Sequence, residues 1–297
     1  MSASWGLGYS PQLARRRRSS VAAAFRGAAG RRAGRGGPGR VAPPRRTVST
    51  PARITFVGHS TVFIDLDGVG ILTDPVLRAR VLHLERRAPA PDLGAIVSPD
   101  LVLVSHVHPD HFDPGSLRLV DSRATLVLPF GSTRLAARLR FDRVVELEAG
   151  QSFEGERVKV TATYADHRPG RLTRRGPPAI GFMLEGSRRV YFAGDTDLFP
   201  EMGELGDDLD VALLPVWGWG PRLGPGHLDP QRAARALALL EPRVAVPIHW
   251  GTLFPRWSLR RSDDLVSAPA RAFAQAARSH APSVDVRLLA PGEATTA

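Results

Sequence analysis

No cysteine occurs among the 297 residues of this chain. Disulfide bonds and thiolate metal sites are therefore excluded, and any bound metal must be held by His, Asp or Glu. The chain also has no apolar run that approaches the roughly 20 residues of a transmembrane helix, so we expect no membrane span. Both absences are compatible with a reducing cytoplasm, which is the predicted location, with a peripheral membrane location as the alternative.

Acidic residues are absent from residues 1–50, which hold eleven arginines. Removing these from the 40 basic residues of the chain leaves 29, against 29 acidic ones, so the net charge of +11 belongs to this segment. The segment is rich in Arg, Ala, Gly, Pro and Ser, which bury too little apolar surface to offset the conformational entropy lost on ordering. This composition predicts a disordered tail over 1–50. The alternative is a tether for an anionic polymer or a membrane surface. Because residues 51–297 are neutral overall, the net positive charge of the chain does not indicate a nucleic-acid-binding domain.

From residue 51 onward, short apolar segments alternate with turns. Strands are predicted at 54–57, 61–65, 69–73, 101–104, 125–128, 158–164, 180–184, 190–193, 209–215, 244–248 and 284–289. Helices are predicted at 115–121, 132–140, 230–240 and 268–278. Hairpins come first and β-α units later, which favours a layered α/β sandwich in a single domain over 51–297.

The clearest helix is the one predicted over 230–240. Asp229 is a suitable N-cap, and Pro230 fits the first helical position. Apolar residues then recur at i, i+3, i+4 and i+7 from Ala233, which is the pattern of a helix with one buried face. Pro242 is expected to end it.

Three imidazoles and a carboxylate lie in His106-Val107-His108-Pro109-Asp110-His111, directly after a strand that is predicted to be buried. Neutral histidine is the commonest metal ligand, and mixed imidazole and carboxylate sets suit zinc, iron or manganese. Other side chains of this kind also follow predicted strands: His59, His167, Asp195 and His249. Strand ends meet at one edge of a sheet on a rigid support, so these side chains are expected to converge.

With these residues in this order, the chain resembles the metallo-β-lactamase superfamily of dinuclear metallohydrolases. The segment from His106 to His111 matches the H-x-H-x-D-H signature, and the resemblance spans roughly residues 51–260. It implies a four-layer αβ/βα sandwich. One branch, with N-acyl-phosphatidylethanolamine-hydrolysing phospholipase D and ascorbate-6-phosphate lactonase, looks most similar. The motifs that carry this are Gly58-His59-Ser60-Thr61, Leu72-Thr73-Asp74-Pro75, Gly226-His227-Leu228-Asp229-Pro230 and Ile248-His249-Trp250-Gly251-Thr252.

The resemblance implies two divalent metal ions, with zinc as the first expectation and manganese or iron as alternatives. One ion would be held by His106, His108 and His167. The other would be held by Asp110, His111 and His249, and Asp195 would bridge the two. Two dications, two aspartates and one hydroxide leave about one positive charge, which favours an anionic transition state.

Four residues are predicted to support the chemistry. Asp110 and His227 are the predicted catalytic residues, and His227 is expected to polarise the scissile group or protonate the leaving group, against the alternative of loop packing. Asp74 is expected to orient a ligand imidazole, or else to be a turn residue before Pro75. For His59, support of a metal ligand and packing at a strand end are weighed equally.

The leading hypothesis is a metal-dependent hydrolase that uses a metal-bound hydroxide on a phosphodiester or lactone-type substrate, either a small molecule or a phospholipid-like ester. Arg168 stands where the phospholipase branch has tryptophan, which argues against lipid specificity. A metal-dependent nuclease that uses the basic tail is the second hypothesis, although the neutral remainder argues against nucleic acid. A non-catalytic metal-stabilised scaffold is the third, although every ligand position is filled. The sequence gives no indication of the oligomeric state.

Overall fold

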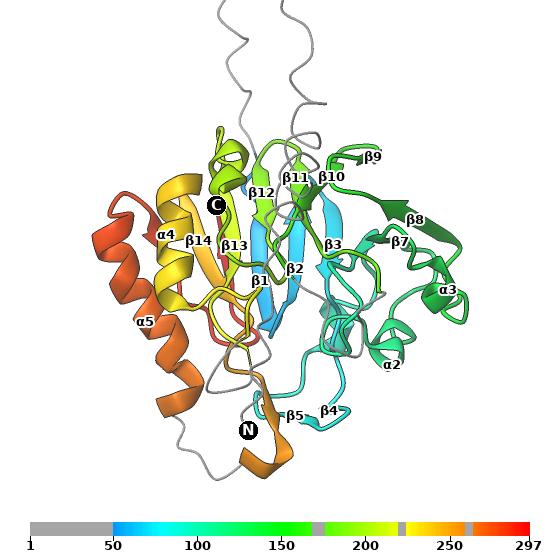
Figure 1. The fold of residues 1–297 in the computed structure, drawn as a ribbon. Helices are drawn as coiled ribbons and strands as arrows, with labels where there is room; N and C mark the ends of the chain where they lie inside the picture. The colour runs from blue at the N-terminus through cyan, green and yellow to red at the C-terminus, as the bar shows by residue number, and fades with distance from the viewer. Residues whose placement is uncertain (1–49, 168–175, 219–223, 259–263) are drawn as a thin grey trace, which may run out of the picture. The chain divides into compact units, whose positions relative to one another are not determined.

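A computed structural model describes residues 50–167, 176–218, 224–258 and 264–297 (Figure 1). Almost all of the predicted tail lies outside these ranges, as does Arg168. The division of the chain into tail and domain therefore stays a prediction.

The first large sheet has seven strands in the order β17-β1-β2-β3-β6-β7-β8. They are β17 (Ala294–Thr296), β1 (Arg53–Gly58), β2 (Thr61–Leu66), β3 (Val69–Thr73), β6 (Leu101–Leu103), β7 (Thr125–Pro129) and β8 (Arg143–Leu147). The pairs from β17 to β3 are antiparallel and those from β3 to β8 are parallel. Asp67 and Gly68 join β2 to β3, and both have positive φ, as a tight two-residue hairpin requires.

The second large sheet has the order β16-β14-β13-β12-β11-β10-β9. Its strands are β9 (Ser152–Glu154), β10 (Lys159–Tyr164), β11 (Ile180–Glu185), β12 (Arg189–Phe192), β13 (Val211–Pro215), β14 (Val244–Ile248) and β16 (Asp285–Val286). Its antiparallel half runs from β9 to β12, and the strands from β12 to β16 are parallel. Every residue of β13 and β14 is buried, which is typical of parallel strands covered on both faces.

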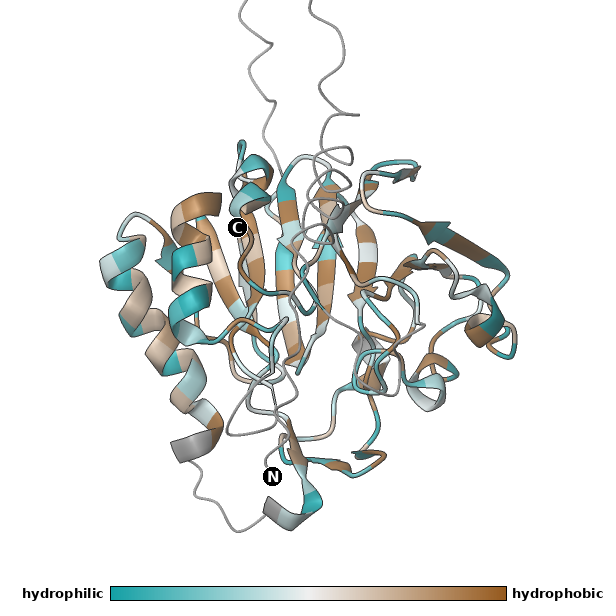
Figure 2. Cartoon of the chain, viewed as in Figure 1, coloured by the Kyte–Doolittle hydropathy of each residue, from teal (hydrophilic) through white to brown (hydrophobic). Residues whose placement is uncertain are grey.

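Helices lie on both sides of the paired sheets (Figure 1). The helices α4 (Pro230–Leu240) and α5 (Asp264–His280) lie on one side, and the short α2 (Pro114–Leu117) and α3 (Thr133–Ala136) lie on the other. Hydrophobic residues concentrate on the strands (Figure 2), where Phe56, Phe182 and Phe192 are fully buried. The predicted layered α/β sandwich is confirmed. Within the described ranges, no helix has the length and apolarity needed to cross a membrane.

Several predicted elements have different lengths in the structure. The helices predicted at 115–121 and 132–140 shrink to the four-residue α2 and α3, and the strand predicted at 284–289 to the two residues of β16. The intrinsic helix propensity of the residues stabilises a one-turn helix very little. Tertiary packing of a few apolar residues therefore decides where such a helix ends. A third sheet, in the order β15-β5-β4, was not predicted, because its strands are very short. They are β4 (Arg80–Val81), β5 (Leu84–Arg86) and β15 (Leu253–Pro255).

Candidate metal centre

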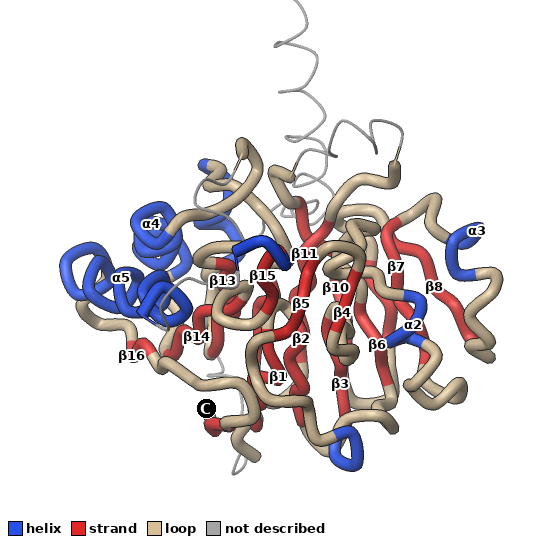
Figure 3. The backbone as a smooth tube through the Cα atoms, turned by 90° about the horizontal axis from the view of Figure 1, so that it is seen from below, coloured by secondary structure: helices blue, strands red, loops and turns tan. Residues whose placement is uncertain are grey.

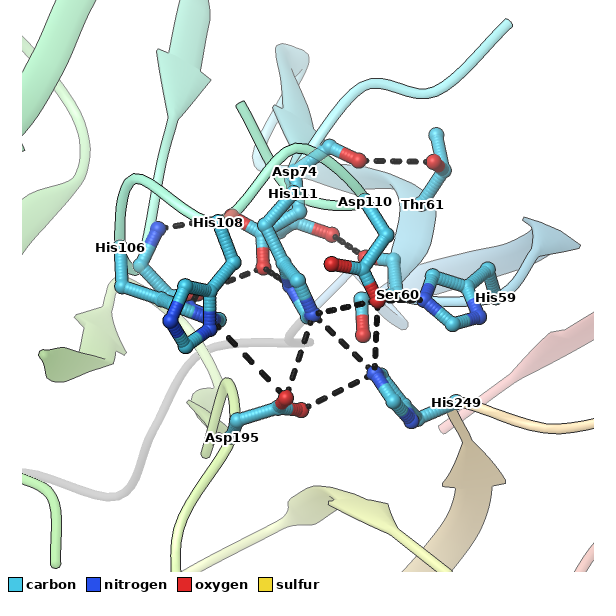
Figure 4. Close-up of polar contacts among 12 residues, drawn as sticks. His59, Ser60, Thr61, Asp74, His106, His108, Asp110, His111, Asp195 and His249 are labelled. Carbon is cyan, nitrogen blue, oxygen red and sulfur yellow. Dashed lines mark hydrogen bonds and ion pairs between the residues drawn. The ribbon is translucent and has the colours of Figure 1, made fainter. Parts of the chain in front are cut away.

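The seven predicted metal ligands follow four strands of the two large sheets, and their ligand atoms lie in close groups. Figure 4 labels all of them except His167. After β6 of the first sheet comes the His106–His111 segment. The second sheet contributes His167 after β10, Asp195 after β12 and His249 after β14. The convergence expected from strand ends is therefore observed for the whole set.

Three imidazole nitrogens form the first cluster. Nδ1 of His108 lies 3.0 Å from Nε2 of His106 and 3.1 Å from Nε2 of His167. Ligands placed tetrahedrally around zinc at its usual distance from nitrogen are about 3.3 Å apart. The three nitrogens therefore need only a slight expansion to hold one such ion.

A second cluster lies around Asp110. Nε2 of His111 and Nε2 of His249 are 3.0 Å apart, and they lie 3.8 and 3.9 Å from Oδ2 of Asp110. Nε2 of His59 lies 3.2 Å from the same oxygen. Two imidazoles and a carboxylate suit zinc, iron or manganese, and the spacing fits one ion.

Asp195 lies between the two clusters and is buried. Its Oδ2 is 3.9 Å from Nε2 of His106 and 3.3 Å from Nε2 of His111. Its Oδ1 is 3.2 Å from Nε2 of His249, yet makes no hydrogen bond within the described part of the chain. The carboxylate of Asp195 thus faces both clusters, and its Oδ1 has no hydrogen-bond donor among the described residues. A bound cation would supply the missing partner of this buried oxygen.

Backbone carbonyls fix two of the ligand imidazoles. Nδ1 of His167 lies 2.7 Å from the carbonyl oxygen of Gly226, and Nδ1 of His249 lies 2.6 Å from that of Trp217. A carbonyl only accepts, so in each ring Nδ1 carries the hydrogen and Nε2 presents a lone pair to the centre. Sequence reasoning missed these two contacts, because a backbone carbonyl leaves no signal in the sequence.

Asp74 fixes two further imidazoles. Its Oδ2 accepts from Nδ1 of His111 at 2.7 Å and from the hydroxyl of Ser105 at 2.6 Å. Because that hydroxyl donates to Asp74, its oxygen is free to accept from Nδ1 of His106, 2.9 Å away. Asp74 is fully buried, and it holds one histidine from each cluster: His111 of the second cluster directly, and His106 of the first cluster through Ser105. Ser105 was missed in the sequence, although it directly precedes the signature.

Burial keeps most of these histidines neutral. It lowers the pKa of His108 to about 4 and that of His249 to about 3, because the charged form loses its hydration. The pKa values of His106 and His167 are lowered for the same reason. Neutral imidazole is the form that binds metals.

The carboxylates and His111 behave in the opposite way. Burial raises the pKa of Asp110 and of Asp195, but nearby histidines outweigh it and hold both values well below the ordinary one. Burial lowers the pKa of His111, but the carboxylates around it, Asp195 first, raise it well above the ordinary value. Without a metal, a proton on His111 therefore offsets the negative charge of the surrounding carboxylates. A bound cation would offset the same charge.

Unusual backbone conformations occur at this edge. His59, Asp74 and His249 have φ angles of 58°, 34° and 62°, in the left-handed region that non-glycine residues rarely adopt. Before Asp195, Gly194 has a φ of 60°, and a Cβ there would lie 2.6 Å from Cβ of Ser105. Such conformations cluster at functional sites, where the surrounding structure supports their cost.

The remaining predicted residues also lie at the centre. His227 has a side chain that is 25% exposed, with Nε2 3.6 Å from Oδ2 of Asp195 and Nδ1 3.1 Å from the carbonyl oxygen of Gly224. His59 is fully buried, and its ring centroid lies 4.0 Å from that of His249. Its Nδ1 has no hydrogen-bond partner among the described residues.

Comparison with known proteins identifies the family. Residues 70–250, more than half of the chain, match the model of the β-lactamase superfamily domain. The chain belongs to the metallo-β-lactamase superfamily. It is 36% identical over 211 residues to a UPF0173 metal-dependent hydrolase of Methanopyrus kandleri, an alignment that covers 68% of this chain and 86% of that protein. The prediction of a metal-dependent hydrolase is confirmed.

The chain is also similar to two further proteins. It is 33% identical over 220 residues to an uncharacterized protein of Mycobacterium tuberculosis, in an alignment that covers 67% of this chain and spans only 58% of that relative. The solved structure of Igni18, a metallo hydrolase from Ignicoccus hospitalis, matches with a TM-score of 0.63 at 26% identity. That match covers 84% of this chain and 99% of the other, so the fold extends over nearly all of the solved protein.

Proposed function

We propose that this superfamily member hydrolyses a phosphodiester or a lactone-type ester with the help of two divalent metal ions. The observation that carries the proposal is the convergence of seven His and Asp side chains, most of which turn a lone pair toward the others. Such an arrangement is costly unless a cation lies among the ligands, because neutral imidazole nitrogens and carboxylate oxygens then repel.

In this proposal the first cluster, His106, His108 and His167, holds one ion. The second cluster, Asp110, His111 and His249, holds the other, and Asp195 bridges them. Zinc is the expected metal, with manganese or iron as alternatives. When bound, such ions supply Lewis acidity and activate water.

The chain's own residues orient these ligands. Asp74 and the carbonyls of Gly226 and Trp217 keep the Nε2 atoms turned to the centre. His59 supports Asp110 through the contact between Nε2 and Oδ2. We therefore assign His59 and Asp74 to positioning rather than to catalysis.

His227 is the proposed proton donor to the leaving group. It is partly exposed, and its Nδ1 faces the carbonyl oxygen of Gly224 while its Nε2 faces Asp195. Neither cluster needs it as a ligand, so it remains available to substrate. Positioned general acids of this kind contribute typically 10²- to 10⁴-fold in rate.

The substrate class rests on charge and on the motifs of the phospholipase and lactonase branch. Two dications against two aspartates leave a positive centre, which stabilises the anionic transition state of a phosphodiester or an opening lactone. No contact among the described residues favours the nuclease alternative, whose basic tail lies almost entirely outside them.

A substrate panel tests this proposal. Protein loaded with zinc or manganese is assayed on a phosphodiester, a phosphomonoester, a lactone and a β-lactam. We expect turnover of the phosphodiester or the lactone and none of the β-lactam. If only the β-lactam is hydrolysed, the proposed substrate class is wrong.

Two variants test the assigned roles in the same assay. His108→Ala should lose metal and most activity, whereas His227→Ala should keep both ions and lose about 10²-fold in kcat. His280→Ala, at an exposed position remote from the centre in the sequence, is the matched control and should resemble the wild type. Loss of metal from His227→Ala, or full activity in His108→Ala, would contradict the assignment.

A further inference from the structure

The third sheet projects from the edge at which the candidate metal centre lies. We use "flap" for residues 78–87, which contain β4 and β5, together with residues 253–258, which contain β15 and the short helix η4 (Arg256–Ser258). In Figure 1 the flap lies below the two large sheets, and Figure 3, seen from below, shows its strands across their ends. The flap follows Asp74 and His249 closely in the chain, so it belongs to the same edge.

Two large apolar side chains protrude from the flap. Leu82 is 75% exposed and Trp257 is 76% exposed, more than any other large hydrophobic residue in the described ranges. Leu82 has a φ of 50° at the tip of the hairpin, a conformation that leucine rarely adopts. Trp257 stacks on His83 with ring centroids 5.2 Å apart. Leu82, His83 and Trp257 line one open groove together with Arg80, Glu85 and Arg256, so the groove combines apolar and charged side chains.

Positive charge surrounds this patch. The flap has five arginines and a single acidic residue, Glu85, whereas residues 51–297 as a whole carry equal numbers of basic and acidic residues. The side chains of Arg80 and Arg256 are 61% and 59% exposed, and both lie near Glu85, at 3.3 and 3.9 Å. One carboxylate cannot neutralise both guanidinium groups, so the rim of the groove stays cationic. The other three arginines are Arg78, which pairs with Asp113 at 2.6 Å, Arg86 and Arg87, so the charge at the groove comes from Arg80 and Arg256.

The flap is joined to the backbone that carries the centre. The guanidinium group of Arg86 donates to the carbonyl oxygens of Val57 and Val76, at 3.4 and 2.6 Å. The backbone N–H of His59 donates to Oγ1 of Thr252 at 2.8 Å, just before β15. A surface bound by the flap would therefore lie beside the segments that carry His59 and Asp74.

We propose that the flap docks on the surface of an anionic lipid bilayer. Leu82 and Trp257 enter the boundary between headgroups and acyl chains, where tryptophan is favoured, and the exposed Arg80 and Arg256 face the lipid phosphates. An apolar tip with a cationic rim fits this partner better than a second copy of the chain, because two cationic rims would repel. The proposal goes beyond hydrolysis, since binding needs no turnover.

Vesicle co-sedimentation of the full chain tests the proposal. Vesicles of phosphatidylcholine with phosphatidylglycerol are compared with vesicles of phosphatidylcholine alone, for the wild type and the double variant Leu82→Ala/Trp257→Ala. The matched control is Phe130→Ala/Leu135→Ala, which removes two other exposed apolar side chains, 54% and 49% exposed. The basic tail is present in all three proteins, so differences between them report on the flap.

We expect the wild type and the control to bind the anionic vesicles, with the double variant at least tenfold weaker. Equal binding by wild type and double variant would show that the tail alone holds the vesicle, and would overturn the proposal. A wild type that dimerises in size-exclusion chromatography while the double variant is monomeric would make the groove an interface between copies, which also overturns it. Vesicle binding is read from the protein that sediments and not from turnover, so failure of the proposed hydrolysis leaves this result readable.

Discussion

At the scale of single residues, Asp74 links the two ligand clusters. Its carboxylate receives hydrogen bonds from His111, from the hydroxyl of Ser105 and, through Oδ1, from the backbone N–H of Ser105 at 2.7 Å. Burial raises the pKa of Asp74, against the effect of His111 and of these hydrogen bonds. Keeping a carboxylate in so buried a place is costly, which argues that its contacts to the histidines are its purpose.

Asp74→Asn should therefore weaken metal binding while the chain stays folded. The amide keeps the shape of the carboxylate, but its NH₂ group cannot accept from His111 or Ser105, so one imidazole loses its orientation. Loss of such a support typically costs 10- to 100-fold in metal affinity. Competition with a chelator, followed by measurement of bound metal, checks this.

A matched control is Asp113→Asn, which alters another buried carboxylate, paired with Arg78 at 2.6 Å. This variant should keep its metal, even if it is less stable. Equal metal affinity in Asp74→Asn and the wild type would leave Asp74 as the turn residue that the sequence also allowed.

What the sequence predicted at this scale was the set of side chains, because a dense signature and strand-end positions identify residue types with ligand chemistry. It did not predict the carbonyls of Gly226 and Trp217, which have no side-chain signal. Nor did it predict the left-handed backbone at His59, because no glycine marks that position. The candidate side chains, and the orienting role weighed for Asp74, could thus be named in advance, but the backbone contacts that hold the imidazoles could not.

At the scale of elements, α4 supports the loop that carries His227. The carboxylate of Asp229 caps the helix by accepting from the backbone N–H of Arg232 at 2.8 Å. The side chain of Arg232 in turn pairs with Asp197, which accepts from the backbone N–H of Gly226 at 3.3 Å. The start of the helix therefore fixes the carbonyl that orients His167.

Asp229→Ala should destabilise the chain and lower its activity together. Loss of an N-cap costs about 1 kcal/mol, and the loosened loop should reduce kcat several-fold. Urea unfolding and steady-state kinetics measure the two effects. Asp92→Ala is the control, since Asp92 caps the short helix η1 (Leu93–Ala95) through the N–H of Gly94 and contacts none of the predicted ligands. If both variants lose activity equally, the loop has no special role.

The helix α4 has the bounds that the sequence predicted, because cap, first-turn proline, apolar stripe and stop signal all agree. The flap strands were missed for the opposite reason. β4 and β5 have two and three residues, and in β5 Arg86 takes the position that alternation from the buried Leu84 would give to an apolar residue. Their pairing with β15 is decided by contacts far apart in the chain, which local periodicity does not reveal.

At the scale of the whole molecule, the centre joins the two large sheets. The His106–His111 segment leaves the first sheet, whereas His167, Asp195 and His249 leave the second. Metal ions shared by these residues would act as cross-links between the sheets. The resemblance indicated this pairing of sheets in advance, whereas strand patterns alone predicted only layers.

Removal of metal should therefore destabilise the whole chain rather than one loop. An ion present at a hundred times its Kd contributes about 2.7 kcal/mol to the free energy of unfolding. We expect a chelator to lower the Tm in calorimetry and added zinc or manganese to restore it. A Tm that is unchanged by chelator would mean that the ligands hold no ion that matters for the fold.

The metal-free chain should also become less stable as the solution is acidified. The pKa of His249, about 3, lies below the value of about 6.5 in the unfolded chain, so below pH 6.5 the unfolded state binds more protons. For this fully buried group the loss at pH 5 is about 2 kcal/mol relative to neutral pH, and it continues until the pH reaches the folded pKa. Urea unfolding of chelated protein at pH 7 and pH 5 measures it, with His249→Gln as the variant that should lose less. An equal loss in both proteins would assign the acid sensitivity to other groups.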